Sequence, residues 1–157
     1  MATALSIKDL EQQEADLVFK TFDEDTAIMI GMALVEAGKA NKAPIVIDIR
    51  TPDRTLFHAA LAGSAPDNDQ WALRKSNFAL RMHCSSMLGG RRLKEAGKTV
   101  GPELGLDLIT YAAHGGSVPI RVAGVGVIGA ITVSGLASAE DHSMVVAAMT
   151  AVLETLR

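Results

Sequence analysis

The segment 114–142 constrains the fold of this 157-residue chain more than any other part of the sequence. Its first strand is indicated by three apolar residues at alternate positions: Val118, Ile120 and Val122. The run Val127–Val133 is apolar on both faces, which is typical of a strand that is covered on both sides. Gly124 and Gly126 lie between the two strands and can adopt the positive φ angles of a tight reversal. The segment therefore predicts a hairpin with helices on both of its faces.

A helix is predicted to follow this hairpin. The Ser138 hydroxyl can cap its N-terminus, and Asp141, three residues later, would complete a capping box. The helix then continues through apolar residues at helical spacing: Val145, Val146, Met149, Val152, Leu153 and Leu156. The capping box also accounts for Asp141 without any further role.

The remaining elements are predicted from periodicity, proline and glycine. In chain order they are a helix at Ser6–Ala15, a strand at Leu17–Phe22, a helix capped by Asp23 or Asp25 and ended by Gly38, strands at Ile45–Arg50 and Thr55–Leu61 around a turn at Thr51–Arg54, a helix at Asn68–Leu88 ended by Gly89 and Gly90, a polar loop at Gly90–Gly105, and a strand at Asp107–Ala112. Because each hairpin turn is too short for a parallel crossover, the pattern favours an antiparallel sheet with helices on both faces. No linker or internal repeat divides the sequence, so we expect one domain over residues 1–157.

Charge and cysteine content exclude several classes of protein. The formal net charge of −3 provides no excess of basic residues to neutralise phosphates, so nucleic acid is not an expected partner. Residues 1–20 contain acidic residues and no sustained apolar run, which argues against a signal peptide and a membrane span. The single cysteine, Cys84, rules out an internal disulfide and is compatible with a reducing compartment. We therefore expect a cytoplasmic protein.

The apolar composition predicts contacts between subunits. A chain of 157 residues buries roughly 70% of its unfolded surface and can form its own core. Hydrophobic residues make up 48% of the chain but aromatic residues only 4%, so this core is mainly aliphatic. Some apolar surface is then left for association. We predict a homo-oligomer.

The predicted helix at 68–88 carries the densest group of polar residues. Arg74 and Arg81 are seven residues apart, with Asn77 or Phe78 between them and Ser85 one turn further, so they share one stripe. Planar guanidinium groups bind carboxylate or phosphate oxygens through two hydrogen bonds each. The stripe therefore indicates an anion site. The alternative is a solvated face that pairs with acidic residues across a subunit contact.

The four histidines do not have the spacing of metal ligands, since HxH, HxxxH and HExxH are absent, and we expect no structural zinc site. His58 is expected in a packed or edge position of its strand, and His83 on an exposed helix position. His114 precedes a Gly-Gly turn and His142 lies in the first turn of the last helix. Either of these two can reach a pocket at the end of the sheet, although a hydrogen-bonded structural histidine is the alternative for each.

Several motifs in this chain occur together. They are HGG-x-x-PI at His114–Ile120, G-x-x-G at Gly126–Gly129, VSG at Val133–Gly135 and the acidic helix start at Asp141. Together they resemble the haem-degrading domain superfamily, also called GlcG-like or HbpS-like. A second pattern, W-x-x-RK-x-N-x-x-x-R-x-x-x-SS, looks like one branch of that superfamily, and it is formed here by Trp71, Arg74, Lys75, Asn77, Arg81, Ser85 and Ser86. Lys75 matches the helical lysine of the family.

The resemblance implies the α+β class and a profilin-like, three-layer α/β/α fold around a five-stranded antiparallel sheet. It also implies that homo-oligomers are common and that some relatives bind haem or related tetrapyrroles, which makes haem a candidate cofactor. The candidate ligand-binding residues are Trp71, Arg74, Lys75, Asn77, Arg81, Ser85, His114 and His142. No catalytic residue and no metal ligand is assigned from the sequence.

Three hypotheses for function follow. In the first, the protein binds a small organic molecule such as haem, its carboxylates held by Arg74, Lys75 and Arg81. His114 or His142 then lies near the centre of the ligand, as an axial ligand if haem binds. The second hypothesis is a non-catalytic homo-oligomeric scaffold or interaction module. The third is an enzyme that uses Asp141 and His142 as an acid/base pair, which is disfavoured because adjacent helical side chains point about 100° apart.

Overall fold

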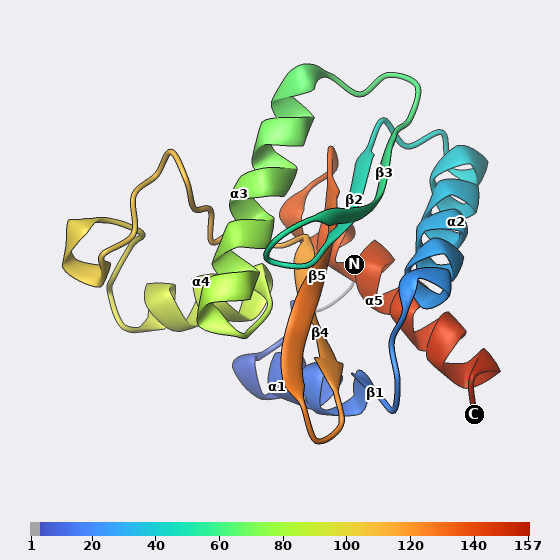
Figure 1. Ribbon diagram of the computed structural model, residues 1–157. Coiled ribbons are helices and arrows are strands. Elements are labelled where there is room, and N and C mark those ends of the chain that lie inside the picture. Colours follow the sequence, from blue (N-terminus) through green and yellow to red (C-terminus); the bar gives the residue numbers. More distant parts are fainter. Residues whose placement is uncertain (1–3) are drawn as a thin grey trace.

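The computed structural model describes residues 4–157, which form five α-helices, one short 3-10 helix and five strands (Figure 1). In chain order these are α1 (Ile7–Asp16), β1 (Val18–Phe19), α2 (Glu24–Ala40), β2 (Val46–Arg50), β3 (Thr55–Ala60), α3 (Pro66–Met82), α4 (Ser86–Glu95), the 3-10 helix η1 (Pro102–Leu104), β4 (Ser117–Val122), β5 (Gly126–Ser134) and α5 (Ser138–Thr155). Within the described residues, no helix has the length and apolar character that crossing a membrane requires.

The strands form one sheet in the order β1-β4-β5-β2-β3. The pairs β4/β5, β5/β2 and β2/β3 are antiparallel, whereas β1 runs parallel to β4 through Val18 and Phe19. The sheet is therefore mixed, and the expectation of a purely antiparallel sheet is wrong at this edge. The reason is that a short turn imposes antiparallel pairing only on strands that are consecutive in the chain, and β1 and β4 are not.

Helices cover both faces of the sheet, as predicted (Figure 1). Helices α2 and α5 pack on one face, and α3 packs on the other; α4 lies beside α3 and also contacts β4 and α5, and α1 packs on α4. The face toward α2 and α5 is formed by buried aliphatic residues of the central strands: Ile47, Ile49, Val118, Ile120, Ile131 and Val133. Each such side chain contributes about 1.5–3 kcal/mol by leaving water. This arrangement confirms the expected three-layer α/β/α architecture.

The hairpin of β4 and β5 also forms as predicted. Gly124 and Gly126 have φ angles of +76° and +108°, and the two strands are antiparallel on either side of them. The second predicted hairpin, β2 to β3, closes with the Thr51 N–H donating to the Arg54 carbonyl at 2.9 Å. Both hairpins were readable because turn residues stand between two apolar runs.

The helix predicted at 68–88 is two helices, α3 and α4. His83 ends α3 in the left-handed conformation, with a φ of +54°, and the Ser85 hydroxyl caps α4 by accepting the Leu88 N–H at 3.0 Å. Gly89 and Gly90 lie inside α4 and do not end a helix. A Cβ at Gly89 would collide with the Phe78 ring and one at Gly90 with the Ala113 carbonyl, so these glycines permit close packing.

Three local expectations are wrong. Residues 107–112 form turns and no strand, because the Asp107 side chain accepts the Thr110 N–H at 2.6 Å and bends the backbone. The cap of α5 is Ala137, so Ser138 is already helical and makes no capping hydrogen bond there. Helix α2 begins after Asp23 as expected but passes through Gly38, which packs against the side chain of Leu61.

Candidate functional site

Helix α3 carries most of the predicted site residues on a defined part of its surface. Its start is fixed by Pro66 in the first turn and by the Asn68 side chain, which accepts the Ala65 N–H at 2.8 Å. From there the helical period places Trp71, Arg74 and Lys75 at i, i+3 and i+4, on one side of the helix. These three side chains therefore reach the same region of the molecule.

Lys75 forms a buried ion pair with Asp141 at the start of α5. Its Nζ lies 3.0 Å from Asp141 Oδ2 and 3.3 Å from the Val133 carbonyl oxygen, and the two residues are only 4% and 1% exposed. The other carboxylate oxygen, Oδ1, accepts the Leu136 N–H at 3.0 Å. Asp141 thus pairs with Lys75 of α3 and accepts a backbone hydrogen bond from the segment before α5. The predicted capping box is wrong.

Burial acts on both members of this pair. It lowers the pKa of the Lys75 amine, while the charge of Asp141 opposes that shift. It raises the pKa of the Asp141 carboxyl, while Lys75 opposes that shift. The two pKa values therefore move toward each other, because a low-dielectric site disfavours the charged form of each group.

The Gly115–Gly116 turn allows the ion pair to form. Gly116 has a φ of +139°, and a Cβ there would lie 2.7 Å from Lys75 Nζ and would collide with the Val133 carbonyl. A Cβ at Gly115 would lie 2.5 Å from the Ser138 carbonyl oxygen. Only glycines permit this approach of the turn to α5 and to the amine.

Three side chains stack beside this turn. The Arg74 guanidinium lies 4.5 Å from the centroid of the Trp71 ring, and the exposed His114 ring meets Trp71 edge to face at 5.4 Å. The Arg74 Nε is buried and has no hydrogen-bond partner among the described residues. The structure therefore brings together four predicted residues, Trp71, Arg74, Lys75 and His114.

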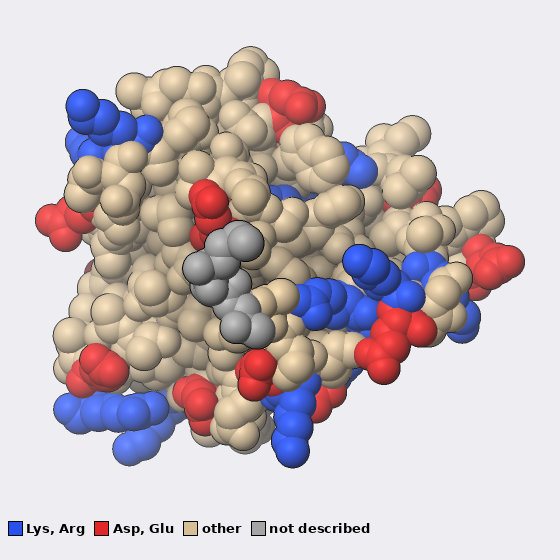
Figure 2. Space-filling model, turned by 180° about the vertical axis from the view of Figure 1, so that it is seen from behind, with Lys and Arg blue, Asp and Glu red and all other residues tan. Residues whose placement is uncertain are grey.

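Two cavities adjoin this cluster, and His114 lines both. The first, which we call the Lys75 cavity, has a volume of about 230 Å³ and is lined by Asn68, Trp71, Lys75, His114, Ser134, Gly135, Leu136, Ser138 and Asp141. The second, the Arg74 cavity, has a volume of about 410 Å³ and is lined by Arg74, Gly90, Leu93, Lys94, Lys98, Thr99, Val100, Leu108, Ala112, Ala113 and His114. Figure 2 shows basic side chains, with acidic ones between them, on the side of the molecule where α4 and the following loop lie.

Four predicted residues line neither cavity. Asn77 donates to the Thr110 carbonyl at 3.0 Å, and Arg81 lies over the Tyr111 ring and donates to its hydroxyl at 3.2 Å. Both hold the segment after η1 against α3. Ser85 is buried as the cap of α4, and His142 is buried against α1. That these four contact a ligand stays a prediction.

His142 is a structural neighbour of α1. Its Nε2 lies 2.8 Å from Gln13 Oε1, and its buried Nδ1 has no partner among the described residues. Burial lowers the pKa of His142 to about 4. Asp141 contacts α3 while His142 contacts α1, so the two side chains do not face each other as an acid/base pair would.

We predict that His142 makes folding sensitive to acid. The imidazole is neutral in the folded protein down to about pH 4, whereas in the unfolded chain it takes up a proton near its ordinary pKa of 6.5. The contribution of neutral His142 to the free energy of unfolding is therefore fully present above about pH 6.5, and roughly 3 kcal/mol of it is lost as the pH drops to 4. Urea unfolding of wild type and His142→Gln from pH 8 to 4 measures this, with the variant lacking that part of the loss. Parallel pH profiles would contradict it.

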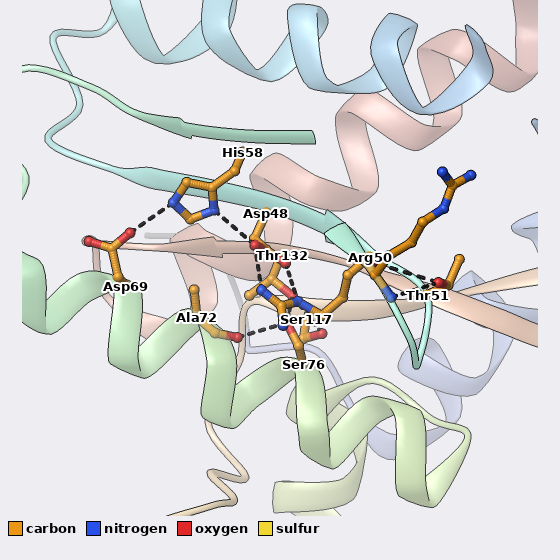
Figure 3. Close-up of polar contacts among 10 residues, drawn as sticks. Asp48, Arg50, Thr51, His58, Asp69, Ala72, Ser76, Ser117 and Thr132 are labelled. Carbon is orange, nitrogen blue, oxygen red and sulfur yellow. Dashed lines mark hydrogen bonds and ion pairs between the residues drawn. The ribbon is translucent and has the colours of Figure 1, made fainter. Parts of the chain in front are cut away.

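A row of polar side chains crosses the sheet beneath α3 and was missed by the sequence interpretation (Figure 3). Its members pair across four neighbouring strands and are Ser117, Thr132, Asp48 and His58. The Thr132 hydroxyl donates to Ser117 Oγ at 2.8 Å and lies 2.8 Å from Ser76 Oγ on α3. The row therefore ties α3, which carries the cluster described above, to the middle of the sheet.

The outer part of this row is charged. The buried Asp48 carboxylate accepts from Arg50 Nε and Nη2 at 2.6 and 2.8 Å, and it lies 2.8 Å from His58 Nδ1. The other ring nitrogen of His58 lies 2.8 Å from Asp69 in the first turn of α3. Burial alone would lower the pKa of His58, but its hydrogen bonds to the two carboxylates raise it above the usual value. The sequence carried no signal for this pair, because the turn at 51–54 alone would set Asp48 opposite Phe57, and the irregularity between Ile49 and Arg50 shifts the register by one residue.

Comparison with known proteins agrees with this fold. The family model described as haem-degrading protein HbpS-like matches residues 22–150. A UPF0303 protein of Streptomyces coelicolor is 50% identical over 147 residues, which are 94% of this chain and 93% of that protein. The crystal structure of the Ybr137w protein has a TM-score of 0.87 and 34% identity, covering 99% of this chain and 92% of that one. The structure of a PduOC–haem complex has a TM-score of 0.71 and 18% identity over 83% of this chain and 94% of that one. This chain therefore belongs to the HbpS-like family of haem-degrading proteins.

Proposed function

We propose that the Arg74 cavity binds small anionic molecules with an apolar body, and that tetrapyrroles such as haem are the first class to test. The observation that carries this proposal is the lining of the cavity. Arg74, Lys94 and Lys98 surround apolar side chains, and the described residues that line the cavity include no acidic side chain. Such a lining favours carboxylates at its rim and an apolar body inside.

Arg74 is the best placed cation of the three. Its guanidinium is held against Trp71, so little side-chain freedom is lost when an anion binds. Its Nε is buried without a hydrogen-bond partner among the described residues, so no acidic side chain there competes with a ligand. The volume of about 410 Å³ lies within the range of pockets for small organic molecules.

The lining also fits haem. The haem propionates are carboxylates that the three cations can bind, and the apolar macrocycle can pack on Leu93, Val100 and Leu108. The exposed His114 offers an imidazole of the kind that ligates haem iron. His142 is buried against Gln13, so His114 is the histidine that would hold the iron if haem were bound. Membership of the HbpS-like family and the haem-bound PduOC neighbour support this ligand class.

We predict that Arg74→Gln weakens haem binding by about ten- to a hundredfold, because one charge-assisted contact contributes roughly 1.5–3 kcal/mol. Arg81→Gln is the matched control. Arg81 is on the same helix and also stacks on an aromatic ring, but it does not line the cavity. Titration followed by Soret absorbance measures both affinities, and equal losses in the two variants would contradict the assignment.

His114→Ala and iron-free protoporphyrin separate the two parts of the proposal. His114→Ala should change the haem spectrum while leaving protoporphyrin affinity close to wild type. Arg74→Gln should weaken both ligands, because the propionates are common to them. If the wild-type protein binds neither haem nor protoporphyrin at micromolar concentration, tetrapyrroles are not the ligand class.

A homo-oligomeric scaffold is the second candidate function, and one surface favours it. Helix α2 exposes three large apolar side chains next to one another, Ile28, Met29 and Met32. Monomeric proteins seldom expose a contiguous apolar patch of this kind. The two candidate functions are compatible, because a ligand-binding protein can also be an oligomer.

We predict that light scattering gives a multiple of the monomer mass at micromolar concentration. The double change Ile28→Glu and Met32→Glu should shift the mass toward the monomer, because it places charges within the apolar patch. Val125→Glu is the control, since Val125 is 71% exposed but isolated at the tip of the β4–β5 hairpin. A monomeric wild type would contradict the prediction and the scaffold candidate with it.

A further inference from the structure

The Lys75 cavity shares His114 with the proposed tetrapyrrole site, is otherwise lined by different residues, and holds an amine beside a carboxyl group. We propose that Lys75 forms a reversible imine with small neutral aldehydes that enter this cavity, with Asp141 as proton donor and acceptor. The proposal does not depend on what the Arg74 cavity binds. It rests on the geometry of the amine, on its surroundings and on the lining of the cavity.

The amine is held in one position by groups from two elements. Lys75 Nζ lies 3.0 Å from Asp141 Oδ2 on α5 and 3.3 Å from the Val133 carbonyl on β5. The Leu136 N–H fixes the other oxygen of the carboxylate at 3.0 Å. Both charged residues nevertheless line a cavity of about 230 Å³, so a small molecule inside it meets the amine and the acid together.

Burial makes this amine a better nucleophile than an exposed lysine. It lowers the pKa of Lys75, so the neutral amine is more populated near pH 7 than on the surface. It also raises the pKa of Asp141, which favours a carboxyl that can donate a proton. A neutral amine and a protonated carboxyl are the two partners that addition to a carbonyl requires.

The reaction balances without an oxidant or reductant. The nitrogen lone pair attacks the carbonyl carbon, a C–N bond forms, and the carbonyl oxygen takes a proton from Asp141. The amine proton passes to the Asp141 carboxylate, which gives a neutral carbinolamine. A second proton from Asp141 lets the hydroxyl leave as water, the C=N bond forms, and loss of the remaining N–H proton returns the carboxyl to its starting state.

The lining indicates the class of aldehyde. Ser134, Ser138 and Asn68 offer polar groups that suit hydroxyl substituents, and the Trp71 indole forms an apolar wall. Asp141 lies beside the amine and would repel a second carboxylate. We therefore infer that a neutral hydroxyaldehyde of a few carbon atoms is preferred, and glyceraldehyde is a suitable probe.

The test is reductive trapping on the full-length folded protein. Glyceraldehyde is added with sodium cyanoborohydride near pH 7, and peptide mapping by mass spectrometry gives the labelling rate of each lysine. We expect Lys75 to react severalfold faster than the exposed Lys94 and Lys98, because burial lowers the pKa of Lys75 and so raises its fraction of neutral amine. Labelling of Lys94 and Lys98 at an equal or higher rate than Lys75 would overturn the proposal.

Asp141→Asn tests the role of the carboxyl. The amide has nearly the same shape but cannot relay a proton, so labelling of Lys75 should slow by about tenfold or more. Circular dichroism confirms that the variant is folded, and the rates at Lys94 and Lys98 serve as internal controls. An unchanged rate at Lys75 in the folded variant would remove Asp141 from the reaction. Haem titration of the same samples reports on the Arg74 cavity independently.

Discussion

Lys75→Met is expected to lower the free energy of unfolding by about 3–5 kcal/mol, because it leaves the Asp141 carboxylate buried without its counter-charge. Lys75 and Asp141 are 4% and 1% exposed, so water reaches the carboxylate only from the small cavity beside it and replaces the lost partner only in part. Urea unfolding followed by circular dichroism measures the loss. The deficit should shrink as the pH is lowered, since Asp141 then takes up a proton and its burial costs less.

Two further variants show whether the loss comes from the unpaired charge. Adding Asp141→Leu to Lys75→Met should recover part of the stability, because an apolar pair in a buried site is often as stable as an ion pair. Arg92→Met is the matched control, since Arg92 and Glu11 are 2.9 Å apart but about half exposed. Its expected cost is below about 1 kcal/mol. Similar losses for Lys75→Met and Arg92→Met would show that burial does not govern the Lys75 pair.

Those parts of the fold that depend on neighbouring residues were predictable. The β4–β5 hairpin and the β2–β3 turn follow from apolar runs separated by turn residues, and both are present. The break between α3 and α4 was not predictable in the same way. His83 adopts a left-handed conformation that few residues other than glycine adopt, while the glycines that signal a helix end, Gly89 and Gly90, are used for close packing.

The same distinction applies to the site. Helical spacing alone places Trp71, Arg74 and Lys75 together, and the structure keeps them together. The partner of Lys75 was hidden because Asp141 is distant in the chain and had a local explanation as a capping residue. Arg74 and Arg81 share a helix stripe, but the Tyr111 ring occupies the neighbourhood of Arg81 while Arg74 borders the cavity. Which face of a stripe borders a cavity is decided by tertiary packing, and helical periodicity carries no information about it.

The glycines of the two turns are expected to separate into two groups when changed to alanine. Gly116 has a φ of +139°, and its added Cβ would lie 2.7 Å from Lys75 Nζ and against the Val133 carbonyl, so both strain and collision oppose it. Gly115→Ala would place a Cβ 2.5 Å from the Ser138 carbonyl oxygen, which is backbone and cannot rotate away. We expect each change to cost about 3 kcal/mol or more, as overpacking at a rigid site does.

Gly126 is the internal comparison, because it shares the positive φ of Gly116 but not the crowding around Gly115 and Gly116. Its φ is +108°, and a Cβ there would meet no atom within 4 Å. Gly126→Ala should therefore cost only the strain of the backbone, about 1–2 kcal/mol. Urea unfolding of the three variants under one set of conditions gives the comparison. Equal losses at Gly116 and Gly126 would mean that φ strain dominates at these two positions, whereas a larger loss at Gly115 and Gly116 shows that contact with α5 and the Lys75 amine is what the HGG turn requires glycine for.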